Sequence, residues 1–322
     1  MKTTPRMHFA RLIAGYGAIV FMLPYLALKI VWLSGNPIGF NDESLVGKPG
    51  MIAANAMSFG MDFVAVGLAL TFTHRWGLRV PAWLVLFPMW VATGFLAPAV
   101  VIAPIAIITQ ALASSPSPST DAMLQPWVGR VVGVSFAGQG AALIVAFVLY
   151  VRTRWADLLQ STPSAVVRGP THPVQVILAN VAALMAVAAG GLHLVWAFGG
   201  TVGLGPRALS EPTAQSYLLN GIWGAMSIIG AAGILTMVHQ WGRAPFKLLL
   251  AFTWIGAGSL FAWGLWTLIL VLPGITLGDR AAGGMALNNC LSFVKFTAGM
   301  LIGLVTVVLL AERQAAIRSR AP

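Results

Sequence analysis

The chain has 322 residues, of which 58% are hydrophobic and only 8% are charged. This leaves too little polar surface to coat a soluble globule of that length, so the composition excludes an ordinary soluble enzyme and predicts an integral membrane protein. The formal net charge of +11 could suggest nucleic-acid binding, and the positions of the basic residues have to decide.

Eight apolar segments follow one another along the chain. Each has about 20 residues or more, which is what a bilayer core of ~30 Å requires at ~1.5 Å of helix per residue. The predicted segments are 10–34, 51–73, 82–109, 129–152, 174–199, 218–238, 246–273 and 286–311. No small-residue cleavage site follows the first one, so we expect it to be retained rather than removed as a signal peptide.

The lysines and arginines predict the orientation of these segments. Most of the 19 fall on one side of the membrane in this arrangement, and only Lys48, Arg130, Arg207 and Arg280 fall on the other. By the positive-inside rule both termini are cytoplasmic, in a multi-pass membrane protein. The basic excess is then explained by topology and by contact with anionic membrane lipids, which argues against a nucleic-acid partner.

A phrase at the end of segment 1 recurs at the end of segment 5. The stretch LKIVWLSGNPIG, residues 28–39, matches LHLVWAFGGTVG, residues 192–203, and TFTHRWGLRVPAWLVLFPMW, residues 71–90, matches TMVHQWGRAPFKLLLAFTW, residues 236–254. The matched pairs include Lys29 with His193, Trp32 with Trp196, Asn55 with Asn220, and Trp90 with Trp254.

These matches predict two four-helix repeats, residues 1–165 and 166–322, joined by a polar linker that contains prolines. A unit with an even number of crossings starts and ends on the same side of the membrane. The two repeats are therefore expected to be parallel, related by an axis along the membrane normal.

Segment 2 carries three polar residues, Asn55, Ser58 and Asp62, whose spacing places them on one helical face. Asp62 lies roughly 16 Å from the outer end of its segment, near the bilayer centre, and Lys295 in segment 8 is expected at a similar depth. Charges there are costly, so both should face the bundle interior, where they could pair with each other. A purely structural ion pair, or a neutral Asp62 bonded to Asn55 and Ser58, is the alternative.

Other polar candidates lie near the predicted outer ends of the segments. Lys29 could extend its ammonium to the interface, and the imidazole of His193 could stay hydrated there. Asp42 and Glu43, in the loop after segment 1, are further candidate acids, although a solvated loop explains them equally well.

The sequence contains no phosphate-binding loop, no GxSxG elbow, no dinucleotide fingerprint and no metal-ligand spacing. Its single cysteine, Cys290, excludes an intramolecular disulfide. Haem held by two histidines needs them at matching depth on facing helices, and only His193 lies within a segment. We therefore expect no cofactor and no metal.

Aromatic residues crowd segments 3 and 7. In membrane helices such side chains mostly face lipid or pack against neighbours. If some of them instead line a cavity that holds a carboxylic acid, the cavity could protonate an alkene or epoxide, and the aromatic faces would stabilise the carbocation. The predicted cavity walls are Trp32, Trp90, Trp196 and Trp254.

The phrase LPYLALKIVWLSGNPIGF and the eight-helix design, rich in Ala, Gly and Trp and poor in acids, resemble the integral-membrane terpene cyclases of bacterial (actinobacterial) indole-sesquiterpenoid, drimentine-type pathways. The resemblance covers the style of the whole chain and includes no catalytic motif. It implies acid-initiated cyclisation of a farnesyl chain that carries a small polar head, without a metal or redox cofactor. The DDxxD and DxDD runs of the soluble cyclases do not occur in this sequence.

The favoured function is therefore a membrane-embedded enzyme acting on a lipophilic small molecule, most concretely a prenyl-chain cyclase. Its proton donor would be Asp62 or, if an ion pair makes Asp62 a poor acid, the loop pair Asp42 and Glu43. The polar side chains expected to bind or orient the substrate are Asn55, Asn220, Lys29, His193 and Lys295.

Two other classes remain open from the sequence. In a proton-coupled transporter, or a protein that binds lipids or small molecules, Asp62 and Lys295 would form a relay at the midplane. An assembly subunit of a respiratory complex would instead copurify with partners. The oligomeric state is not predicted.

Overall fold

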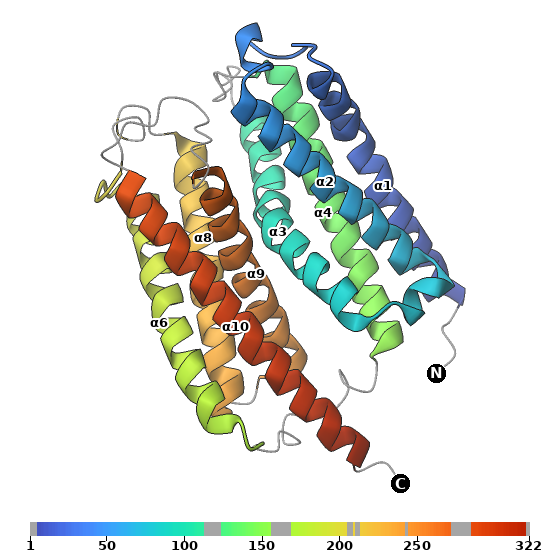
Figure 1. Cartoon of the computed structure of the whole chain (residues 1–322), viewed down its shortest axis with the longest axis vertical. Coiled ribbons are helices and arrows are strands. Elements are labelled where there is room, and N and C mark those ends of the chain that lie inside the picture. The colour runs from blue at the N-terminus through green and yellow to red at the C-terminus, as the bar shows by residue number, and fades with distance from the viewer. Residues whose placement is uncertain are drawn as a thin grey trace. The chain divides into compact units, whose positions relative to one another are not determined.

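The computed structural model describes residues 5–112, 124–155, 169–204, 209, 213–241, 244–271 and 285–319. Eight helices in these ranges are long and apolar enough to cross a membrane (Figure 1). They are α1 (Pro5–Leu33), α2 (Pro49–Thr73), α3 (Ala82–Leu112), α4 (Pro126–Arg154), α6 (His172–Ala197), α8 (Ala214–His239), α9 (Phe246–Val271) and α10 (Met285–Ser319). The predicted all-helical, eight-span membrane class is confirmed over the described part of the chain.

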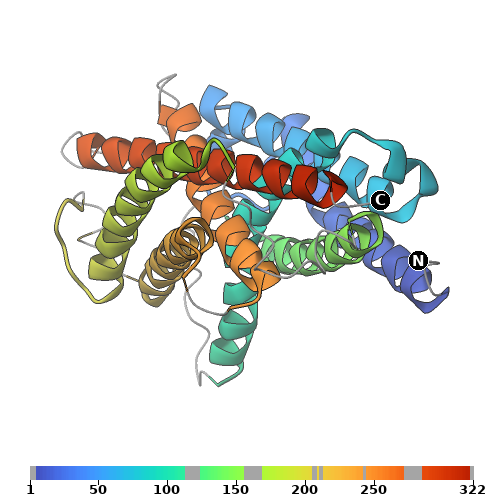
Figure 2. The same ribbon diagram turned by 90° about the horizontal axis from the view of Figure 1, so that it is seen from below.

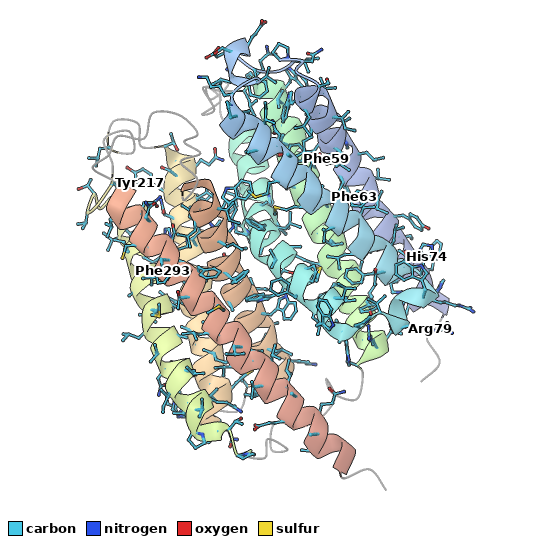
Figure 3. All side chains as sticks on the ribbon, in the orientation of Figure 1. Phe59, Phe63, His74, Arg79, Tyr217 and Phe293 are labelled. Carbon is cyan, nitrogen blue, oxygen red and sulfur yellow. The ribbon has the colours of Figure 1, made fainter. Side chains whose placement is uncertain are left out.

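Large apolar side chains project outward along these helices. Phe63 on α2 and Phe293 on α10 are both exposed, and Figure 3 shows them pointing away from the helix bundles. A helix that is apolar on its outer as well as its inner face is typical of a membrane span, because lipid solvates the outer face. The chain is therefore a multi-pass membrane protein in contact with lipid.

The helices group into two compact units. The first unit holds α1, α2, α4 and most of α3, and the second holds α6, α8, α10 and most of α9. In the first unit α1 packs along α2, and in the second α6 packs along α8 and α10. Figure 2 gives the end-on view, in which the neighbouring helices within a unit can be followed.

The chain leaves α1 and α6 through the same turn. Gly35 and Gly199 each adopt φ of 87°, a left-handed conformation that glycine reaches without strain because it lacks Cβ. Just before each turn the buried indole of Trp32 or Trp196 donates from Nε1 to the backbone carbonyl six residues further on, at 2.8 Å. The recurring phrase of the sequence thus encodes the same local structure in each unit.

A second recurring sequence, HRWG and HQWG, lies at the ends of α2 and α8, where its histidine and tryptophan stack although the backbone differs. His74 stacks on Trp76 with 6.2 Å between ring centroids, and His239 stacks on Trp241 with 4.6 Å. Both tryptophans are exposed, as expected for side chains that anchor a helix end at a membrane interface. Figure 3 shows His74 together with Arg79 at this end of the first unit.

Glycines bring α6 and α8 into backbone contact next to the polar residues of the second unit. A Cβ added to Gly190 would lie 3.0 Å from the carbonyl oxygen of Gly224, and one added to Gly224 would lie 2.9 Å from that of Gly190. Small residues at a membrane helix crossing allow this approach. The crossing lies one turn from His193 on α6 and one turn from Asn220 on α8, so it fixes their spacing.

Candidate functional site

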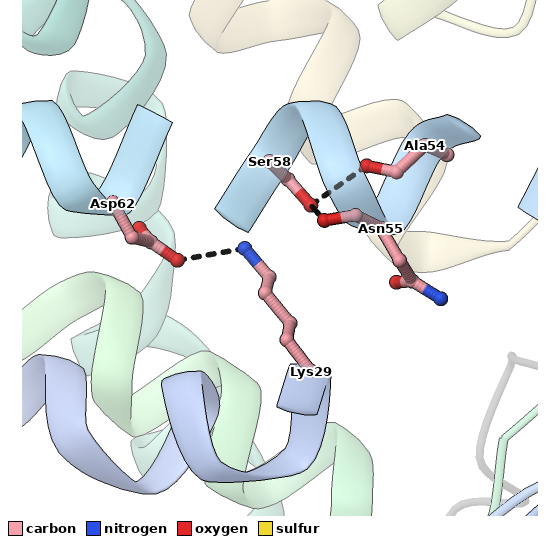
Figure 4. A network of polar contacts seen from close by, with 5 residues as sticks. All are labelled: Lys29, Ala54, Asn55, Ser58 and Asp62. Carbon is pink, nitrogen blue, oxygen red and sulfur yellow. Dashed lines mark hydrogen bonds and ion pairs between the residues drawn. The ribbon is translucent and has the colours of Figure 1, made fainter. Parts of the chain in front are cut away.

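The first unit buries an ion pair between two adjacent helices. Lys29 of α1 donates from Nζ to Oδ2 of Asp62 of α2 at 2.7 Å, and the two side chains are 0% and 6% exposed (Figure 4). A buried ammonium requires a counter-charge, because removing it from water costs several kcal/mol, on the order of what a well-formed pair returns. The carboxylate of Asp62 meets that requirement.

Two further side chains complete the environment of this pair. The ring centroid of Tyr25, one turn before Lys29, lies 3.9 Å from Nζ, so the ammonium contacts a π face as well as a carboxylate. Gln139 of α4 is buried close to the Asp62 carboxylate. We call Tyr25, Lys29, Asp62 and Gln139 the lysine–aspartate cluster.

The other two polar residues of α2 do not hold Asp62. The hydroxyl of Ser58 donates to its own helix, to the carbonyl of Ala54 at 2.8 Å and that of Asn55 at 3.2 Å (Figure 4). Asn55 is buried one turn before Ser58, and its backbone carbonyl accepts from that hydroxyl. On this face of α2, Asp62 is therefore held by an ion pair with Lys29 and not by hydrogen bonds to Asn55 and Ser58.

Three expectations from the sequence are corrected by this geometry. Asp62 pairs with Lys29 and not with Lys295, because α1 packs along α2 and presents a lysine of the same unit. Lys29 does not reach for the interface, since its counter-ion holds it inside. His193 is buried as well, and Nδ1 of its ring bonds to the side-chain amide of Asn220.

In the second unit, His193 of α6 takes the place in the repeated phrase that Lys29 has in the first. Its Nδ1 lies 2.8 Å from Oδ1 of Asn220 on α8, and Nδ2 of Asn220 donates to the carbonyl of Ser216 at 2.8 Å. Because this second bond fixes which amide atom faces the imidazole, the hydrogen-bond network assigns the proton to Nδ1. The buried Nε2 then carries a lone pair, and it has no partner.

A second buried lysine, Lys295 of α10, faces aromatic rings. Its Nζ lies 5.3 Å from the ring centroid of Trp223 on α8. His193 and Trp263 also lie against Trp223, with centroids 5.5 Å and 5.3 Å away. Within the described residues no carboxylate pairs with Lys295, which is 7% exposed. We call His193, Trp223, Trp263 and Lys295 the tryptophan–lysine cluster.

The loop carboxylates Asp42 and Glu43 lie outside both clusters. Asp42 caps the short 3₁₀ turn η1 (Glu43–Leu45), where its side chain accepts from the backbone N–H of Ser44 at 3.0 Å. These hydrogen bonds from Ser44 hold the pKa of the Asp42 carboxyl below its ordinary value. Both side chains are exposed to solvent, so they have the surroundings of a loop rather than of an enclosed acid.

The four predicted wall tryptophans are distributed between the two units. Trp32 lies against Tyr25 at 6.4 Å between centroids, and Trp196 against His193 at 5.2 Å, so each borders one of the clusters. Trp90 is buried in α3 and packs on Phe87, while Trp254 in α9 is half-buried. Two of the four thus touch a polar cluster.

Sequence reasoning missed four members of these clusters, namely Tyr25, Gln139, Trp223 and Trp263. Tyr25 lies one turn before Lys29, and Trp223 lies one turn after Asn220, so helical spacing from a nominated residue would have found both. Gln139 lies one turn after Ser135, the residue that aligns weakly with Lys295. Each was hidden because a tyrosine, tryptophan or glutamine in an apolar segment is ordinary on its own.

No group of three or more His, Cys, Asp or Glu side chains suited to a metal ion occurs among the residues that the structure describes. Comparison of the chain with models of protein families, with curated proteins and with solved structures found no match. The functional argument therefore depends on the residues themselves.

Proposed function

We propose that this membrane protein is an enzyme that acts on a lipophilic small molecule, and most concretely that it cyclises a prenyl (sesquiterpene) chain by acid initiation. The observation that supports this is the enclosed carboxylate of Asp62, held by Lys29 beside the ring of Tyr25. The ion pair makes Asp62 a weaker acid, but Asp42 and Glu43 are exposed to solvent, and only Asp62 is enclosed and able to take a proton from its lysine partner. Such an enclosed proton donor and an aromatic face that already contacts a cation are the two elements that this chemistry needs.

The proposed reaction begins with the proton of the ion pair. Transfer from Nζ of Lys29 to Oδ2 of Asp62 gives a neutral amine and a carboxylic acid. That acid protonates the terminal double bond or epoxide of the prenyl chain, a C–H or O–H bond forms, and the positive charge moves to carbon near Tyr25. Ring closure consumes the double bonds, and return of a proton to Asp62 ends the reaction as an isomerisation.

The arrangement of the chain in the membrane is part of the proposal. We place two parallel four-helix repeats, residues 1–165 and 166–322, in a bacterial inner membrane with both termini in the cytoplasm. The matched Gly35 and Gly199 turns support a repeat, and the side on which most lysines and arginines fall supports the orientation.

The test is mass spectrometry of cells that express the full chain and are supplied with a farnesylated indole. We expect an isomer of unchanged mass and shifted retention time, absent with Asp62→Asn and present with the control Asp42→Asn/Glu43→Gln. If the control variant abolishes the isomer and Asp62→Asn does not, the loop carboxylates are the acids. No isomer from wild-type protein that is folded in the membrane would overturn the cyclase.

Loss of activity through unfolding needs its own control. Asp62→Asn leaves Lys29 buried and unpaired, whereas the double variant Lys29→Met/Asp62→Leu removes both charges and is expected to fold. A folded double variant that makes no isomer would assign chemistry to the pair. A double variant with wild-type activity would make the pair purely structural.

A proton-coupled transporter is the second candidate, and it is favoured by the buried Lys29–Asp62 ion pair that joins α1 to α2. Protonation of Asp62 would break the pair, and the two helices could then move relative to each other. A transporter would give counterflow of its substrate in proteoliposomes and no new compound, and Asp62→Asn would abolish the pH dependence of that flux.

A further inference from the structure

The tryptophan–lysine cluster in the second unit contains more polar groups than it satisfies. Nε2 of His193 and the indole N–H groups of Trp223 and Trp263 are all buried without a hydrogen-bond partner among the described residues. The ammonium of Lys295 beside them contacts a ring, and no carboxylate in the same part of the chain pairs with it. A buried donor without a partner costs about 1 to 3 kcal/mol, and an unpaired buried charge costs more.

The four groups come from four helices and meet around one side chain. The ring centroid of Trp223 on α8 lies 5.5 Å from that of His193 on α6 and 5.3 Å from that of Trp263 on α9. Nζ of Lys295 on α10 lies 5.3 Å from the Trp223 centroid. Nine buried side-chain atoms lack a hydrogen-bond partner among the described residues, and three of them lie on Trp223 and the two rings that contact it. The ammonium of Lys295 faces the same ring, so donors and a charge converge at one place and can serve one ligand.

The chemistry of the cluster specifies its ligand. Lys295, Trp223 and Trp263 can only donate hydrogen bonds, and Lys295 carries a positive charge, so the ligand must be an anionic acceptor with several oxygens. Nε2 of His193 accepts, which suits a ligand that also carries a hydroxyl. A phosphate group meets both conditions, and it presents more oxygens than a carboxylate.

The position of the cluster indicates what carries the phosphate. Lys295 lies ten residues into α10, roughly 15 Å along a membrane-spanning helix. A free ion would have to leave water to reach that depth, whereas the head of an amphiphile can enter while its chain remains in apolar surroundings. We propose that the tryptophan–lysine cluster binds the phosphate head group of an amphiphile.

The first unit provides an internal contrast. Lys29 is also buried against an aromatic ring, but Asp62 neutralises it, so no anionic ligand is required there. In the second unit the residue that aligns with Asp62 is Ser227, whose hydroxyl donates to the carbonyl of Trp223 on its own helix at 2.7 Å. The proposed phosphate thus supplies the charge that the first unit obtains from its own chain.

The test is isothermal titration calorimetry of the full chain in a neutral maltoside detergent with decyl phosphate, and with decanol as the uncharged control. We expect saturable binding of decyl phosphate alone. Lys295→Met should weaken it about tenfold or more, and Lys295→Arg should retain it. Lys247→Met, which removes an exposed lysine from the start of α9 in the same unit, should leave it unchanged.

Competition experiments distinguish the source of the phosphate. If phosphatidylglycerol displaces decyl phosphate, the natural ligand is a membrane lipid. If inorganic phosphate displaces it, the ligand is a free anion. If neither does, the ligand is an amphiphile that carries a phosphate monoester. Trp223→Phe keeps the ring and removes the N–H, so it should weaken binding about fivefold even if Lys295→Met fails to fold.

Equal binding of decyl phosphate and decanol would overturn the proposal, as would equal affinities of the Lys295→Met and Lys247→Met variants, because the cluster would then hold only water. The assay contains no turnover step and does not depend on the proposed cyclisation. The two proposals can therefore fail separately.

Discussion

The first unit buries a lysine together with a carboxylate, and the second buries a lysine with which no carboxylate of the described residues pairs. In the first unit Lys29 on α1 bonds to Asp62 on α2 at 2.7 Å. In the second unit Lys295 lies on α10, the last helix, and its Nζ faces the ring of Trp223 at 5.3 Å. The buried lysine thus lies on the first helix of one unit and on the last helix of the other, and its partner is a carboxylate in the first unit and an aromatic ring in the second.

The helix ends next to these lysine sites have the same local structure in both units. The turns after α1 and α6 have the same φ at Gly35 and Gly199, and the same indole-to-carbonyl bond closes behind each of them. The comparison teaches that a helix framework can be kept while its interior chemistry changes. A self-neutralised cluster is chemically closed, and one with unpaired donors is open to a ligand.

The largest expected effect comes from opening the closed cluster. Asp62→Asn should lower the free energy of unfolding by about 3 to 5 kcal/mol, because Lys29 is left as an uncompensated buried charge. Unfolding in mixed micelles followed by circular dichroism would measure this. Lys29→Met/Asp62→Leu should recover most of the loss, and an unaffected Asp62→Asn protein would show that the pair contributes nothing.

A smaller effect separates two asparagines that align in the repeat. Asn220→Ala should cost about 1 to 3 kcal/mol, because Nδ1 of His193 becomes a buried donor without an acceptor. Asn55→Ala removes no such bond and should cost less than Asn220→Ala in the same unfolding assay. Equal losses would mean that the bond to His193 is not what stabilises Asn220.

For the lysine of the tryptophan–lysine cluster, the expected change in the free energy of unfolding has the opposite sign. Lys295→Met removes a buried charge that has no counter-ion among the described residues, so it should leave the free energy of unfolding unchanged or raise it by about 1 kcal/mol in the absence of ligand. A large loss of stability, like that expected for Asp62→Asn, would remove the contrast between the two units.

The smallest effects test the shared framework. Gly35→Ala and Gly199→Ala should each cost about 1 kcal/mol, since alanine is strained in the left-handed region and no neighbouring atom lies where its Cβ would be placed. The informative quantity is the difference between them. If thermal unfolding shows stability losses for the two variants that differ by more than about 1 kcal/mol, the turns after α1 and α6 are not equivalent.

Most of the fold follows from hydropathy, and its errors have a physical cause. The apolar run that predicted segment 1 begins at residue 10, but α1 begins at Pro5. The run of segment 8 ends at residue 311, but α10 continues to Ser319 through AERQAAIRS, which is rich in good helix formers. Hydropathy locates the part of a helix that lies in lipid, and a helix can extend beyond it.

The site was only partly predictable. Helical spacing placed Asp62 on a polar face, and burial of charge predicted a partner, but spacing within one helix does not give the rotation of that helix against its neighbours. The choice of Lys29 over Lys295 depends on that rotation. The tryptophan–lysine cluster was equally hidden, because its four members come from four helices.

The positions of the two lysines in the chain have a consequence for synthesis and membrane insertion. When α1 leaves the ribosome, Lys29 lies near the end of its span without a counter-ion, and a charged side chain within a span disfavours insertion. Asp62 follows 33 residues later, which is on the order of a few seconds of translation. The first two helices are therefore best inserted together as a hairpin. Lys295 emerges on the final span, after every aromatic side chain that will contact it has been made, so it enters the bilayer with its surroundings already in place.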